Sequence, residues 1–133
     1  MMKKEITVNV PLILDVLDEL RDLEIQKKLW VIGDPHEVTS LQEAIVALYD
    51  DSVLDYALEK KDQVFTADID SKLVTLYKLF SKLDRDRDAA DIIYTEEWRI
   101  IRELADDLYH LIGNSEVAKN WHPDDLVVQK ILK

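Results

Sequence analysis

The chain has 133 residues, 47% of them hydrophobic, and a net charge of −11 at pH 7. It is therefore long and apolar enough to bury a core, while its acidity disfavours binding to nucleic acid or to anionic membranes. Two glycines and three prolines are too few for the tight turns of a β-sandwich or barrel, and the lack of cysteine excludes disulfides and fits a cytoplasmic location. The composition predicts an all-α protein.

The first ten residues predict an extended N-terminal arm. Ile6, Val8 and Val10 alternate with polar residues, a period of two, and Val10 precedes a proline. A helix is then expected from Pro11 to about Val31, with Asn9 or Val10 at its cap. We expect the arm to lie across the helices, although pairing with a partner chain is an alternative.

The next helical region predicts a break. Ser40-Leu41-Gln42-Glu43 has the pattern of a capping box at a helix start. One straight helix over residues 39–61 would bring carboxylates into line with Leu41 and Leu48 and bury them, at a cost of several kcal/mol each. We therefore predict a break near Asp50–Ser52 that divides this region into two short helices.

Three more helices are expected. The first begins at Asp68 or Asp70 and continues to about Leu83. The second begins after Thr95, stops at Gly113-Asn114 and places Trp98, Ile101, Ala105, Leu108 and Ile112 on its buried face. The last is a short helix from Pro123, in a C-terminal region 115–133 that packs on the bundle. Residues 1–133 are thus expected to form a single-domain helical bundle of four to six helices, with a short extended N-terminal arm over residues 1–10.

Negative charge is concentrated between Asp34 and Asp62, where eight carboxylates accompany two lysines. Within this segment the spacings of Asp51, Asp55, Glu59 and Asp62 are four, four and three, which aligns them along one stripe where the backbone is helical. Tyr49 and Tyr56 lie nearby in sequence. Tyrosine is enriched at interface hot spots, so both are candidate anchors, unless their rings pack into the core.

The leading hypothesis is a non-enzymatic module that binds a basic protein partner by charge complementarity, without a cofactor. An inhibitor or immunity-type protein is one concrete form of it. The expected partner-binding residues are Asp50, Asp51, Asp55, Glu59, Asp62, Tyr49 and Tyr56.

Two alternatives stay open. One is a metal-dependent all-α hydrolase similar to nucleotide pyrophosphohydrolases, in which carboxylates spaced three apart on two adjacent helices hold magnesium. Its candidate ligands are Glu103, Asp106, Asp107 and His110, but no second acidic pair stands at a suitable distance before them, so no family is identified. The other is a helical homo-oligomer with a structural role.

Overall fold

The computed structural model describes residues 8–32, 41–60, 63–83 and 89–121. These residues form eight α-helices and two π-helical segments, and none of them lies in a strand. The predicted all-α fold is therefore confirmed. The buried residues of the helices form one hydrophobic core, which includes Leu17, Leu48, Leu76 and Leu108.

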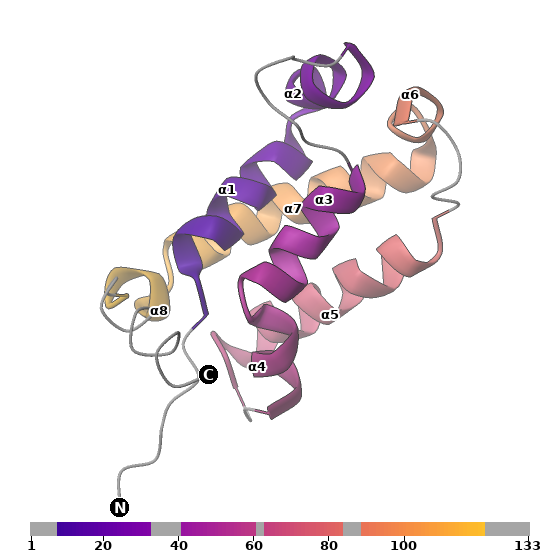
Figure 1. Cartoon of the computed structure of the whole chain (residues 1–133). Coiled ribbons are helices and arrows are strands. Elements are labelled where there is room, and N and C mark those ends of the chain that lie inside the picture. Colours follow the sequence, from indigo (N-terminus) through magenta and orange to yellow (C-terminus); the bar gives the residue numbers. More distant parts are fainter. Residues whose placement is uncertain (1–7, 33–40, 61–62, 84–88, 122–133) are drawn as a thin grey trace, which may run out of the picture.

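Three longer helices make the frame of the protein (Figure 1): α1 (Val10–Arg21), α5 (Ala67–Ser81) and α7 (Glu96–Gly113). Helix α7 packs against both of the others. All five residues predicted for its inner face are buried, because the apolar positions recur at the helical period: Trp98, Ile101, Ala105, Leu108 and Ile112.

The other segments are shorter. They are α2 (Leu23–Gln26), the π-helical η1 (Lys27–Ile32), α3 (Leu41–Val46), the π-helical η2 (Ala47–Asp51), α4 (Leu54–Lys60), α6 (Ala89–Ile92) and α8 (Glu116–Lys119). The expected number of four to six helices compares with eight α-helical segments. The difference comes from the division of the first predicted helix and from the four-residue helices α6 and α8, which were not predicted.

The expectation of one helix from Pro11 to about Val31 is wrong at Asp22. This residue has extended backbone, with φ −114° and ψ 106°, and its carboxylate accepts hydrogen bonds from the amides of Glu24 and Ile25. A carboxylate in this position satisfies free amides at a helix start. Asp22 therefore ends α1 and caps α2, instead of continuing the polar outer face of one long helix.

Gln26 holds this break against the rest of the core. Its side chain is fully buried, and its amide nitrogen donates to the carbonyls of Glu19 and Leu20 at 3.0 and 2.7 Å. Its amide oxygen accepts from Trp98 Nε1 at 2.7 Å. One glutamine thus satisfies carbonyls near the end of α1 and the indole of α7, since buried polar groups need partners.

The start of α1, the start of α5 and both ends of α7 lie at or near the residues that the sequence signals predict. Asn9 caps α1 through a bond from the amide of Leu12, as expected, and Thr95 caps α7. Helix α7 ends at Gly113 with Asn114 as its cap, also as predicted. Helix α5 starts at Ala67 behind a Thr66 cap, slightly before the expected start.

The described beginning of the chain docks on its own helices. Val8 is buried, and its carbonyl accepts from Trp121 Nε1 at 2.9 Å. The amide of Asn9 donates to the Ser52 carbonyl at 2.9 Å. The rest of the expected arm (residues 1–7), the capping residue Ser40 and the helix expected from Pro123 lie outside the described residues.

Candidate functional site

The acidic surface predicted from the sequence lies where η2 gives way to α4. Asp50, Asp51, Asp55 and Glu59 are all exposed there, and we call these four residues the acidic corner. Asp62, the fifth expected acid, lies outside the described residues. Between Leu41 and Lys60 the chain has five carboxylates and one lysine, so the corner is strongly negative.

The break predicted near Asp50–Ser52 is confirmed, and Ser52 organises it. The amide of Ser52 donates to the Ala47 carbonyl at 3.1 Å, which closes the π-helical turn. The buried Ser52 hydroxyl donates to the Leu48 carbonyl and accepts from the amide of Leu54 at 3.2 Å. The serine thus ends one helical segment and starts the next.

Val53 completes the break with an unusual backbone. Its φ is +68°, the only positive value among the non-glycine residues of the described chain. For a β-branched side chain this left-handed conformation is strained. This conformation turns the chain between Asp50–Asp51, at the end of η2, and Asp55, in the first turn of α4.

The break also changes the expected acidic stripe. Asp55 and Glu59 are four residues apart on α4 and share a helix face, as the spacing predicts. Asp51 is the last residue of η2, separated from them by Ser52 and Val53. The acids therefore occupy a corner formed by two segments rather than one straight line.

The two tyrosines predicted as anchors differ in exposure. Tyr49 is 4% exposed, and its hydroxyl donates to the Leu73 carbonyl at 2.9 Å. Burial, with contributions from Tyr77 and Asp55, raises the pKa of the Tyr49 phenol well above its ordinary value. Tyr49 is therefore a core residue in this structure, and its burial keeps it from acting as a surface anchor. Tyr56 is 53% exposed and stays available.

Two hollows flank the ridge formed by α3 and η2. The first, of about 320 Å³, is here called the corner hollow, and it is lined by Gln42, Ile45, Val46, Tyr49, Asp50, Asp55, Tyr77, Phe80 and Ser81. The second, of about 450 Å³, lies toward α1 and is lined by Val16, Glu19, Gln42, Glu43, Ala44, Val46, Ala47 and Asp51. Asp50 and Asp55 of the acidic corner thus line the corner hollow, and Asp51 lines the second hollow.

Tyr77 of α5 is 48% exposed at the rim of the corner hollow. Its ring meets that of Tyr49 edge to face, with centroids 5.0 Å apart. Sequence reasoning missed it as a site residue. The sequence signal was its position directly after Leu76. Because Leu76 already belongs to the buried face of α5, the next residue lies at the side of that face.

The alternative metal ligands on α7 do not converge. Asp106 pairs with Arg21 of α1 at 2.9 Å, whereas Asp107 pairs with Lys72 of α5 at 2.8 Å. Glu103 pairs with Arg99 at 2.6 Å on α7 itself. Within the described ranges, no group of three or more His, Cys, Asp or Glu side chains is placed to hold a metal ion.

His110 completes this set on the outer side of α7. Its Nδ1 lies 2.8 Å from the backbone carbonyl of Asp106 and therefore donates to it. The hydrogen bond that the Arg21 guanidinium donates to the Asp106 carboxylate raises the pKa of Arg21. The same guanidinium lies 4.0 Å from the centre of the Tyr109 ring. The ion pairs of Asp106 and Asp107 join α7 to α1 and α5, so these two carboxylates connect helices.

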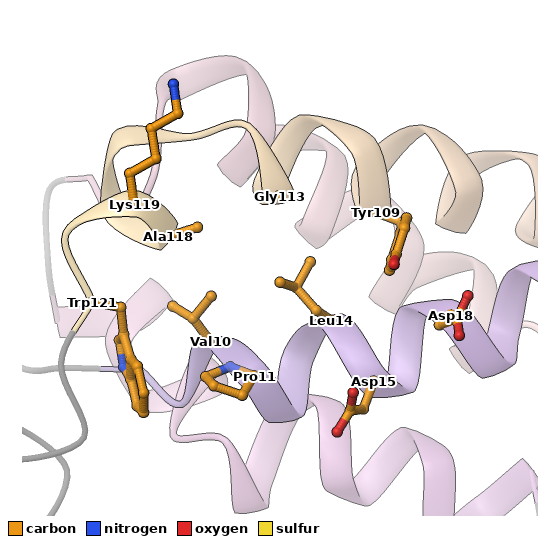
Figure 2. Close-up of a pocket in the computed structure, with 10 residues that line it drawn as sticks. All are labelled: Val10, Pro11, Leu14, Asp15, Asp18, Tyr109, Gly113, Ala118, Lys119 and Trp121. Atoms are coloured by element: carbon orange, nitrogen blue, oxygen red, sulfur yellow. The ribbon is translucent and has the colours of Figure 1, made fainter.

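A third hollow lies between the start of α1 and the end of α7 (Figure 2). Its volume is about 450 Å³, and Leu14, Tyr109 and Trp121 lie around it, with Asp15, Asp18 and Lys119 at its edge. Trp121 is also the last described residue before residues 122–133.

None of the helices formed by the described residues is long and apolar enough to cross a membrane. Comparison with known proteins finds no family, no curated protein and no solved structure that matches this chain.

Proposed function

We propose that the protein is a non-enzymatic acidic module that binds a basic protein partner through the acidic corner. The observation that carries this proposal is that acids of the corner have no cationic partner, whereas several acids elsewhere in the described residues do. Asp50, Asp51 and Asp55 have no ion pair with any lysine, arginine or histidine of the described residues.

Several cations elsewhere in the described chain are already paired with acids. Arg21, Lys72 and Arg99 each bind two carboxylates, among them Asp106, Asp107 and Glu103 of α7. Among the ion pairs of the described residues, the one that involves the acidic corner is that of Glu59 with Lys60, at 3.8 Å. Neighbouring like charges repel each other, and a cationic partner would relieve that repulsion.

The local backbone supports a functional role for the same place. The corner combines a π-helical segment with a valine at positive φ. Both features are found often at functional sites, because a fold retains strained backbone where the resulting surface is useful. A basic partner, rather than a second copy, fits this surface, since a copy would present the same negative charge.

The test uses a fluorescently labelled hexa-lysine peptide as the basic probe. The Asp51→Asn/Glu59→Gln variant removes two charges from the corner, and Glu97→Gln/Glu116→Gln removes two exposed charges from the first turns of α7 and α8. We expect the corner variant to weaken binding about fivefold, as for two exposed ion pairs worth about 1 kcal/mol together. The control variant should bind nearly as the wild type does.

Affinity is measured by fluorescence anisotropy over a series of salt concentrations. The corner variant should also show a shallower salt dependence, because fewer charges take part in the contact. Equal losses in both variants would mean that only net charge matters, and the acidic corner would then not be the binding surface.

A further inference from the structure

The corner hollow combines an exposed aromatic ring with free carboxylates. Six large hydrophobic side chains of the described residues are exposed, and two of them, Val46 and Tyr77, line this hollow. Asp50 and Asp55 line it as well, from η2 and α4. Exposed aromatic side chains beside charged groups are characteristic of interface anchors.

The aromatic wall is held in place by the core beneath it. The ring of Tyr49 meets those of Tyr77 and Phe80 edge to face, at centroid distances of 5.0 and 6.4 Å. The Tyr49 hydroxyl is already bound to the Leu73 carbonyl, so this residue offers only its ring. Tyr77 is therefore a supported ring with about half of its surface open to a ligand.

The chemistry of the hollow suits a cation with a planar head. Carboxylates and the faces of aromatic rings both attract positive charge. A guanidinium can pair with a carboxylate through two hydrogen bonds and stack on a ring at the same time, whereas an ammonium acts as a point charge. The described residues that line the hollow are all neutral or acidic, so no resident cation competes.

The apolar part of the hollow fits the rest of an arginine. Ile45 and Val46 of α3 belong to its lining, and the three methylene groups of an arginine can pack on such side chains while the charged head stays at the rim. We propose that the corner hollow receives an arginine side chain of the basic partner, between Tyr77 and the carboxylates of Asp50 and Asp55. This inference rests on the proposed function and adds a specific anchor to it.

The test compares labelled hexa-arginine and hexa-lysine peptides at equal ionic strength by fluorescence anisotropy. We expect wild type to bind hexa-arginine about threefold tighter or more. Tyr77→Leu should abolish this preference by removing the ring, and Tyr77→Phe should keep it. Tyr94→Leu, which removes an exposed tyrosine at 61% exposure outside the hollow, is the matched control and should leave the preference unchanged.

The Asp55→Asn variant gives a second measurement that leaves the ring contact between Tyr77 and Tyr49 in place. It should weaken hexa-arginine binding more than hexa-lysine binding, whereas Asp51→Asn, outside the corner hollow, should weaken both alike. Equal binding of the two peptides, with no effect of Tyr77→Leu on their ratio, would overturn the arginine site and leave the proposed function standing. Failure of both peptides to bind would overturn both.

Discussion

Val53 has a strained backbone conformation that only glycine would adopt without cost. At φ +68° the Cβ atom of a residue lies too close to its own backbone, whereas glycine has no Cβ atom and avoids this contact. The effect can be isolated by comparing two variants that both lack the valine side chain. We expect Val53→Gly to be about 1 kcal/mol more stable than Val53→Ala.

The stability of the two variants is measured by urea unfolding followed by circular dichroism. The slope of the free energy of unfolding against urea concentration should be equal for both, which checks that the unfolded state is unchanged. Equal stability of the two variants, or a more stable alanine variant, would show that the backbone relaxes from positive φ once the valine is removed.

The neighbourhood of Val53 shows what single residues in a sequence can reveal. The break at Ser52 was predictable, because a straight helix would have buried carboxylates. The positive φ of a valine was not, since valine gives no turn signal of the kind that glycine or asparagine gives. Nor could spacing decide that Tyr49 is buried and Tyr77 exposed, because both fit an apolar helix face and the choice depends on which helix packs against them.

At the level of whole elements, Gln26 connects three of them. Its side-chain nitrogen donates to two carbonyls near the end of α1, and its side-chain oxygen accepts from the Trp98 indole of α7. Gln26 itself is the last residue of α2. We expect Gln26→Ala to lower the free energy of unfolding by about 3 kcal/mol, because it leaves a cavity and an unpaired buried Trp98 indole.

Two further variants separate these causes in the same unfolding experiment. Gln26→Leu fills much of the space but donates and accepts nothing, so its loss reports the hydrogen bonds. Gln63→Ala, at an exposed glutamine, should change stability by less than about 0.5 kcal/mol. A Gln26→Leu variant as stable as wild type would mean that the hydrogen bonds of Gln26 contribute no net stability.

Elements differed in how far the sequence predicted them. Helices α5 and α7 are long enough for the apolar period to repeat several times, and both were predicted. The end of α1 was missed, because Asp22 fits the polar face of a continuous helix as well as it fits a cap. The four-residue α6 and α8 are too short to show any period.

The whole molecule has a net charge of −11, and its acids repel each other at low ionic strength. We expect the melting temperature to rise by a few degrees when sodium chloride is raised to about 0.15 M, where the screening length falls to about 8 Å. The Asp51→Asn/Glu59→Gln variant should gain less, because part of the repulsion has been removed.

Magnesium chloride at matched ionic strength separates screening from specific binding. Screening alone gives nearly the same shift with either salt, apart from the greater strength of a divalent ion as a counterion. A much larger rise with low millimolar magnesium would indicate a site that binds the folded state, and the hydrolase alternative would gain support.

The hydrogen bond from Trp121 to Val8 joins residues 113 positions apart, so the described polypeptide is nearly a closed ring. Closing a loop of this length costs conformational entropy, and that cost grows only slowly with loop length. The cost arises once, when the whole chain folds. Unfolding that starts at either end of the described chain has to break this hydrogen bond. The two extremities of the described chain are expected to lose their order together, as one cooperative event.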